Sequence, residues 1–205
     1  MRLSRSVLAF AAVLASATVI EAALPKPQLP PDSVSLTGQL LVASAAMKDP
    51  RFQRTVILIV RHSPSGAFGI AINRPAGQRP LAELLARFGE KEDLDGAVHV
   101  FAGGPVEPDL GFVVHTTDYK LAETGTINAD VAFTAGPNIL RDIGRKKGPL
   151  KALVAFGYAG WGPNQLEAEL AHDAWFTITA DSALIFDEGR DRVWDEAVAR
   201  RPRAQ

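Results

Sequence analysis

Residues 153–175 read LVAFGYAGWGPNQLEAELAHDAW, the pattern of a buried strand, a glycine-rich loop and a helix. The apolar run 153–156 has the length of a buried strand. Pro163 is typical of the first turn of a helix, and Leu166 and Leu170 follow it at helical spacing. A strand, a glycine loop and a helix often build a site, although the polar groups of this segment are poor catalysts on their own. Between strand and helix, the loop carries Gly157, Tyr158, Gly160, Trp161 and Gly162.

Nucleotide binding is the first functional interpretation of these glycines. Their order, G-x-x-G-x-G, is not the dinucleotide-binding order, and no Lys-Ser or Lys-Thr pair of a phosphate-binding loop follows them. Pro163 also removes one N–H donor from the helix start, where an anion would need it. A structural explanation is therefore favoured. The glycines allow a tight strand-to-helix turn with close packing around Trp161, and Gln165 and Glu167 complement the helix start.

Glu169 and His172 form a Glu-x-x-His pair on one face of that helix. Di-iron bundles use this pair, but they need two copies of it and further glutamates from other helices. The chain has one copy, so we predict a surface pair that faces solvent.

The rest of the chain predicts strands and helices in an irregular order. Strands are expected at 39–44, 54–62, 67–73, 98–101, 111–116, 131–134 and 176–179, and helices at 80–88, from 139 to a stop at Gly148, and at 193–198. The run VILIV, residues 56–60, is too uniformly apolar for a half-exposed strand and should lie mid-sheet, covered on both faces. Residues 73–77 are expected to leave the sheet. Without a regular βαβ rhythm, the α+β class is favoured over a doubly wound sheet.

Composition excludes several chemistries. The 205 residues are 47% hydrophobic and 22% charged, and the net charge of -1 gives no electrostatic reason to expect nucleic-acid binding. The absence of cysteine excludes disulfides, thiolate zinc sites, iron–sulfur clusters and a cysteine nucleophile.

The amino terminus has the order of a secretory signal peptide. Arg2 and Arg5 precede the apolar run VLAFAAVLASATVI, residues 7–20, and Ala22 and Ala23 follow it. We predict a signal peptide over 1–22, a stiff proline-rich spacer over 23–36, one domain over 37–198 and a basic tail over 199–205. The protein is then periplasmic or otherwise exported, with no transmembrane helix in the mature chain, since the apolar run is short. The alternatives are an uncleaved interfacial anchor, or a cytoplasmic protein whose start is assigned wrongly.

No catalytic, cofactor-binding or metal-binding residue is assigned from the sequence. The four histidines are irregularly spaced and are predicted to be hydrogen-bonded or exposed, and no Gly-x-Ser-x-Gly elbow occurs. The glycine turns instead define a candidate binding surface. Its residues are Asn73, Arg74, Gly103, Gly104, Tyr158, Trp161, Gln165 and Glu167.

Four ordered blocks of the sequence resemble the YqgE/AlgH family. They are GQLLVA at 38–43, GAFG at 66–69 through NRP at 73–75, GGPV at 103–106 and GYAGWGP at 157–163. The resemblance covers about residues 37–194 and implies an α+β fold with a bent, partly barrel-like mixed sheet surrounded by helices. The family is read as a transcriptional regulator of alginate production, its biochemical function is poorly defined, and it resembles cytoplasmic proteins. The leader and spacer depart from that pattern, as do Ala45-Ala46 and Asn164.

Two hypotheses of different class follow. The first is a non-enzymatic binding or regulatory protein with an unknown protein or small-molecule partner and no direct DNA contact. The second is a small-ligand-binding protein, or an enzyme of unassigned reaction, with a cleft near the glycine-rich loops. The second gains if Arg74, His62 or His115, and Glu167 line one deep pocket. The first gains if these groups are scattered or held in structural pairs.

Overall fold

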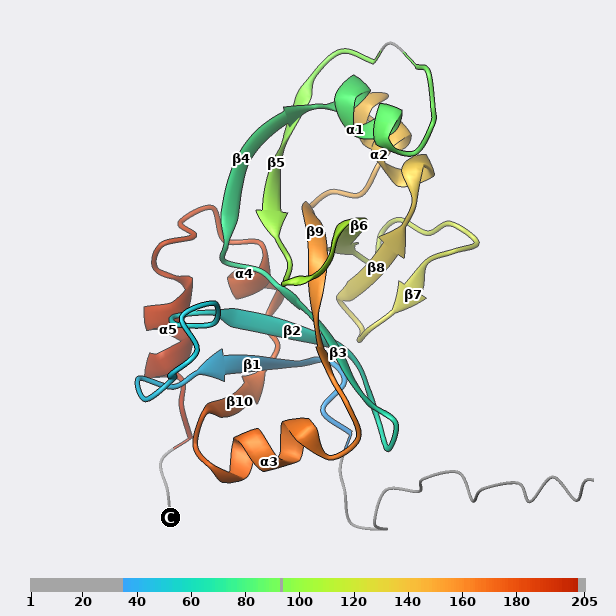
Figure 1. Ribbon diagram of the computed structural model, residues 1–205. Helices are drawn as coiled ribbons and strands as arrows, with labels where there is room; N and C mark the ends of the chain where they lie inside the picture. Colours follow the sequence, from blue (N-terminus) through green and yellow to red (C-terminus); the bar gives the residue numbers. More distant parts are fainter. Residues whose placement is uncertain (1–34, 93, 203–205) are drawn as a thin grey trace, which may run out of the picture.

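The computed structural model describes residues 35–92 and 94–202. In them a bent sheet is covered by short helices (Figure 1). The strands are β1 Gln39–Ala43, β2 Val56–Ser63, β3 Gly66–Ala71, β4 Pro75–Pro80, β5 Ala97–Ala102, β6 Val106–Thr116, β7 Gly125–Thr126, β8 Val131–Ala135, β9 Ala152–Trp161 and β10 Trp175–Thr179. The helices are α1 Leu81–Arg87, α2 Pro137–Gly144, α3 Gln165–Ala171, α4 Ser182–Ile185 and α5 Val193–Ala199. The predicted signal peptide and most of the predicted spacer lie outside the described residues.

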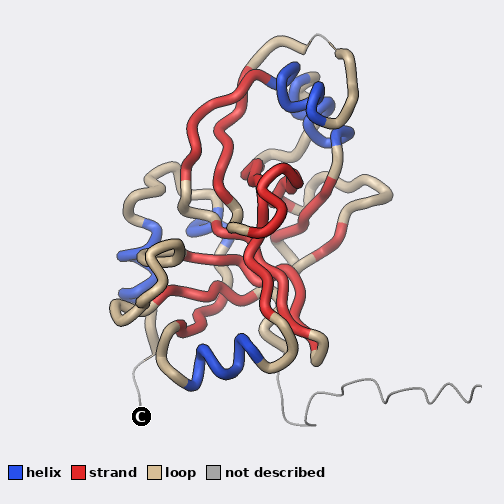
Figure 2. The backbone as a smooth tube through the Cα atoms, viewed as in Figure 1, coloured by secondary structure: helices blue, strands red, loops and turns tan. Residues whose placement is uncertain are grey.

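The strand order confirms the α+β class and the bent mixed sheet. The main path runs β10-β1-β2-β3-β9-β6-β8-β7, and β5 joins β9 in parallel while pairing with β4 on its other side. The remaining pairs are antiparallel. Figure 2 shows the strands as one curved band with the helices at its periphery. None of the helices formed by the described residues has the length and apolar character needed to cross a membrane.

The β2 strand is buried on both faces, as the run VILIV predicts. Val56, Leu58 and Val60 point into an inner cluster that α4 and α5 complete. Ile57 and Ile59 point to the opposite face, where Leu166 of α3 packs against them. A third cluster lies beneath α1 and α2, on the outer face of the second half of the sheet. Each half of the sheet therefore has its own helical cover.

The predicted glycine loop is wrong, because residues 157–161 continue β9 as a strand. The first half of β9 pairs with β5 and β6, and its second half pairs with β3. Ala155 faces the inner cluster, and so does Tyr158, three residues later. Side chains on the same face of a regular strand lie an even number of residues apart. The strand therefore accommodates one extra residue between Ala155 and Tyr158. Gly157 takes that place with φ of +72°, and Trp161 consequently faces α3.

Two further backbone segments meet β9 at this point. The amide of Gly103 donates 2.7 Å to the carbonyl oxygen of Phe156, and its carbonyl oxygen accepts 2.8 Å from the amide of Ala71. A Cβ atom on Gly104 would overlap the backbone of Tyr158. Gly103 and Gly104 therefore lie against β9 too closely for a side chain at either position.

Several other boundaries differ from the prediction. Residues 75–80 form the exposed edge strand β4. The prolines at its two ends suggested an exit from the sheet, but proline is tolerated in edge strands. The helix expected to stop at Gly148 ends at Gly144. The β6 strand begins five positions before the predicted start, with an irregular pairing between Val106 and Gly111. The short β7 carries no apolar pattern and was not predicted.

Candidate functional site

A groove lies between α3 and the loop that follows β1. Its volume is about 550 Å³, and it is walled by loop residues 46–52 on one side and by Gln165, Glu169 and His172 on the other. Pro105 and Val106 close one end. We call this the α3 groove. Its volume falls within the range of small-molecule sites.

Aromatic rings form the floor of the α3 groove. The ring of Phe52 packs edge-on against Trp175 at 5.5 Å between centroids, and Trp175 packs edge-on against Trp161 at 6.1 Å. Both tryptophans are buried, so mainly their edges reach the groove. The bulge at Gly157 and the strand-to-helix connection place Trp161 there. The arrangement gives a rigid apolar base beneath polar walls.

Glu169 fixes this floor. One of its oxygens, Oε2, accepts hydrogen bonds from the indole nitrogens of Trp161 at 3.0 Å and Trp175 at 2.8 Å. The other, Oε1, accepts 2.9 Å from the amide of Gln165, whose own oxygen accepts from the backbone of Gly162. The prediction of a solvent-facing pair with His172 is therefore wrong for Glu169, because two indole N–H groups need an acceptor. His172 is exposed and bonds to the carbonyl oxygen of Ala168.

A second hollow of about 480 Å³ adjoins the α3 groove across Arg51, Phe52 and Pro105. It is lined by Asn73, Arg74 and Gly104 of the candidate surface. The structure thus brings five predicted residues to two neighbouring hollows: these three, together with Trp161 and Gln165 of the α3 groove. The loop residues that complete both hollows were not predicted.

Asn73 and Arg74 also hold the loop in place. The Asn73 amide oxygen accepts 2.9 Å from the backbone of Val56, and its nitrogen donates 2.8 Å to the carbonyl oxygen of Arg54. The Arg74 guanidinium donates to the carbonyl oxygen of Arg51. Both side chains therefore shape the hollow by fixing the loop that forms its wall.

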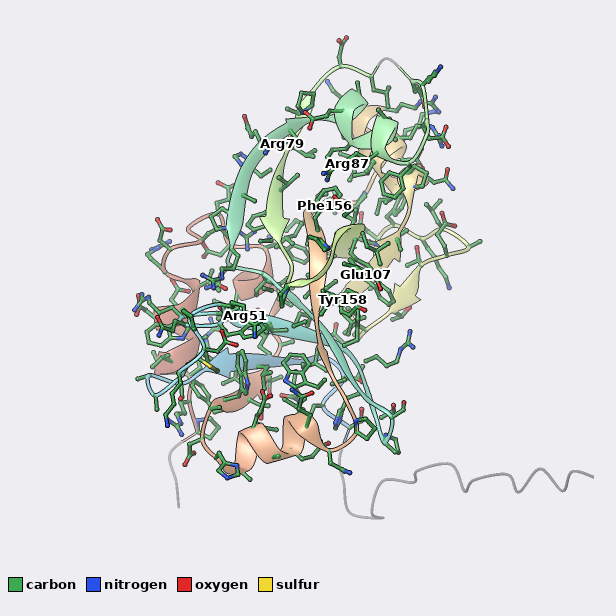
Figure 3. All side chains as sticks on the ribbon, viewed as in Figure 1. Arg51, Arg79, Arg87, Glu107, Phe156 and Tyr158 are labelled. Carbon is green, nitrogen blue, oxygen red and sulfur yellow. The ribbon has the colours of Figure 1, made fainter. Side chains whose placement is uncertain are left out.

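The other three predicted residues lie elsewhere. Gly103 is in the backbone crossing against β9. Tyr158 packs on Phe68 in the inner cluster, and its hydroxyl donates 3.4 Å to Glu107, beside it in Figure 3. Burial, together with the Glu107 carboxylate, raises the pKa of Tyr158. Glu167 lies 2.8 Å from the Nε2 atom of His62, away from the lining of the groove.

The histidines are hydrogen-bonded and dispersed. His62 accepts the backbone N–H of Leu36 at Nδ1, so its Nε2 donates to Glu167. His115 is fully buried, donating from Nδ1 to the Thr116 carbonyl oxygen at 2.8 Å and accepting at Nε2 from Thr134. Burial lowers the pKa of His115. The described residues contain no group of three or more His, Cys, Asp or Glu side chains positioned to hold a metal ion.

The walls of the two hollows carry charges of both signs. Lys48, Arg51 and Arg74 are basic, whereas Asp49 and Glu169 are acidic. Asp49 receives hydrogen bonds from the Arg51 guanidinium, which lower the pKa of that carboxyl. Such walls can orient a polar or charged partner over an apolar floor. No serine or threonine lines the α3 groove, so the groove offers no hydroxyl nucleophile.

The bent mixed sheet with its separately covered halves defines an α+β protein. A sequence model of the family described as AlgH-like matches residues 40–203. A UPF0301 protein of Methylococcus capsulatus is 39% identical over 172 residues, spanning 84% of this chain and 94% of that protein. Another, from Jannaschia sp., is 43% identical over 166 residues, spanning 80% and 86%. The chain belongs to the AlgH-like family, which confirms the resemblance read from its four sequence blocks.

Solved structures agree with this assignment. The solution structure of the AlgH protein from Pseudomonas aeruginosa is similar with a TM-score of 0.71 and 37% identity, covering 84% of this chain and 91% of that one. A crystal structure of a Corynebacterium diphtheriae protein has a TM-score of 0.63 at 20% identity, which shows the fold alone.

Sequence reasoning missed Trp175 and loop residues 46–52 as parts of the site. Loop residues carry no periodic signal. Trp175 is the last residue of the segment 153–175, and no pattern in that segment places its side chain next to Trp161. The sequence does contain a signal for the site. Trp161 and Trp175 flank α3, and the carboxylate of Glu169 within α3 accepts from both indole groups.

Proposed function

We propose that this chain is a non-enzymatic binding protein and that the α3 groove, with the adjoining hollow, receives its partner. The observation that carries the proposal is the aromatic floor fixed by Glu169. A preformed apolar base with polar walls lets a partner bury an apolar side chain while its polar groups meet charged residues at the rim. Rigid walls also lower the entropic cost of binding.

The dispersal of the polar groups supports binding over catalysis. Arg74 lines the second hollow, whereas Glu167 pairs with His62 outside both hollows and His115 is buried between Thr116 and Thr134. General acid–base chemistry needs two such groups within reach of one reacting atom. Here each is held in a pair that stabilises the fold.

A small-ligand-binding protein or an enzyme is the second candidate. It is favoured by the volume of the α3 groove, which suits a small molecule, and by the guanidinium of Arg74 in the adjoining hollow. A thermal-shift screen with nucleotides, carboxylic acids and divalent metals tests it. A concentration-dependent rise in Tm that Lys48→Glu abolishes would favour this candidate.

A regulatory role would act through a protein partner. The net charge of -1 is consistent with regulation that involves no direct DNA contact. We also propose export through the predicted signal peptide. Fractionation of cells that produce the full-length protein with a carboxyl-terminal tag, followed by amino-terminal sequencing, tests this. A mature chain that begins near residue 23 is expected, and a cytoplasmic product that begins at Met1 would exclude export.

The groove itself is tested with a matched pair of charge reversals. Lys48→Glu changes an exposed side chain of the groove wall, whereas Lys91→Glu makes the same change in the loop after α1. Cross-linked partners of the wild-type protein and both variants are quantified by mass spectrometry. We expect a partner captured by the wild type and by Lys91→Glu but depleted with Lys48→Glu. Equal capture by all three proteins would reject the groove as the binding surface.

A further inference from the structure

The turn that joins α2 to β9 displays an isolated leucine among basic residues. Residues 145–151 read RKKGPLK, and the side chain of Leu150 is 86% exposed. Single exposed apolar residues are common on protein surfaces and need no explanation by themselves. Leu150 is distinguished by the backbone that presents it and by the charges around it.

Hydrogen bonds on both sides of Leu150 hold the turn. Its own amide donates 3.0 Å to the carboxylate of Asp118. The amide of the next residue, Lys151, donates 3.2 Å to the hydroxyl of Thr116, and its carbonyl oxygen accepts 3.1 Å from the amide of Thr116. On the other side, the amide of Lys147 donates 2.8 Å to the carbonyl oxygen of Asp142. Leu150 is therefore fixed in an outward position, and a partner need not order the turn when it binds.

Lysines surround the leucine in the sequence and across the adjacent loop. Lys146, Lys147 and Lys151 belong to the turn, and Lys120 lies two residues beyond Asp118. All four are exposed, and none takes part in an ion pair within the described residues. Arg145 differs, because Glu92 neutralises it. The patch thus carries four lysine charges that no ion pair within the described residues neutralises. The acidic groups beside it are Asp118 and Asp142, whose carboxylates accept hydrogen bonds from the amide of Leu150 and the hydroxyl of Tyr119.

We propose that this turn is a contact site for a negatively charged lipid bilayer. A lysine ammonium is a mobile point charge suited to diffuse attraction by anionic headgroups, whereas specific phosphate recognition favours the bidentate guanidinium of arginine. An apolar side chain held at the centre of the patch makes no favourable contact with the phosphates of a nucleic acid. It can enter the interfacial layer of a bilayer. One leucine and four lysines give a weak, reversible contact.

The surface is separate from the α3 groove. It is built by α2, the start of β9 and the loop after β6, whereas the groove is built by α3 and the loop after β1 (Figure 1). Membrane contact can therefore hold or fail independently of the function proposed for the groove.

Co-sedimentation with vesicles of phosphatidylglycerol and phosphatidylcholine, compared with phosphatidylcholine alone, tests the proposal. We expect binding to the anionic vesicles only, and its loss in 0.5 M salt (about a 4 Å screening length). Replacing Lys146, Lys147 and Lys151 together by glutamine should weaken binding by about a hundredfold, and Leu150→Gln by about tenfold. The matched controls Lys91→Gln and Leu110→Gln, on other exposed positions, should bind as the wild type does.

Insertion of Leu150 is tested directly, because the chain contains no cysteine. A Leu150→Cys variant carries one site for a polarity-sensitive dye, and we expect a blue shift of its emission on anionic vesicles. No binding to anionic vesicles overturns the proposal. So does vesicle binding that survives Leu150→Gln unchanged without a blue shift, or salt-sensitive binding to duplex DNA or RNA at least as strong as to vesicles.

Discussion

Glu169 accepts a hydrogen bond of 2.8 Å from the indole nitrogen of the buried Trp175, and the same oxygen serves Trp161. Replacing Glu169 by alanine leaves two indole N–H groups without an acceptor. Each unpaired buried donor costs about 1–3 kcal/mol, so we expect a loss of about 2–4 kcal/mol in the free energy of unfolding. Urea denaturation measures this loss. The control Glu188→Ala, at an exposed position, should change stability by less than about 0.5 kcal/mol.

Gly157 and Gly160 lie on one strand but should tolerate alanine very differently. Gly157 has φ of +72°, and a Cβ atom there would overlap the carbonyl oxygen of Gly104. We expect Gly157→Ala to cost about 3 kcal/mol or more, or to prevent folding. A Cβ atom on Gly160 would lie 3.3 Å from the ring of Tyr158, which can move. Thermal unfolding of both variants tests the contrast, and equal Tm values would contradict the role given to the bulge.

Asn73 should matter for loop order as well as for any binding. Alanine at this position leaves the amide of the buried Val56 without its 2.9 Å acceptor and releases the carbonyl oxygen of Arg54. We expect a loss of about 1–2 kcal/mol in stability. Native-state hydrogen exchange should show faster exchange at Val56 and across residues 51–55. Unchanged exchange there would mean that the loop is held by other contacts.

His115 should make stability depend on pH in mildly acidic solution. Burial lowers the pKa of His115 in the folded state, so below the unfolded value of about 6.5 the unfolded chain binds the proton more readily. The stability conferred by the neutral imidazole is therefore complete above pH of about 6.5 and decreases as the pH falls below it. Urea denaturation from pH 7.5 to 5 measures the slope. His115→Gln should flatten the curve in this window, and an unchanged slope would contradict the assignment.

The sequence was informative where burial follows a simple period. The run VILIV at 56–60 predicted a strand covered on both faces, and the leucines at 81, 84 and 85 predicted α1. The failures occurred where tertiary contacts override local pattern. Residues 157–161 carry the glycines of a loop, yet β3 and β6 pair with them and make them a strand. In β4 the prolines suggested an exit from the sheet.

The candidate site was predictable only in part. The glycine turns led to Asn73, Arg74, Gly104, Trp161 and Gln165, which line the two hollows. Glu167 was expected, with Gln165, to complement the helix start, but its position two residues after Gln165 turns its side chain toward His62. The wall formed by residues 46–52 depends on how a loop folds against Asn73 and Arg74, which no local pattern encodes.

The pairing of β1 with β10 has a consequence for how the chain acquires its structure. Ala43 of the first strand lies opposite Trp175 of the last, so the neighbours that complete β1 are synthesised at opposite ends of the domain. Pairings of such long sequence separation are slow to form. A nascent chain must keep one edge of the apolar β1 segment exposed until residues 175–179 emerge, and during this interval it is most exposed to aggregation. Refolding should therefore be limited by this closing step, and truncation before residue 175 should leave β1 without its partner β10.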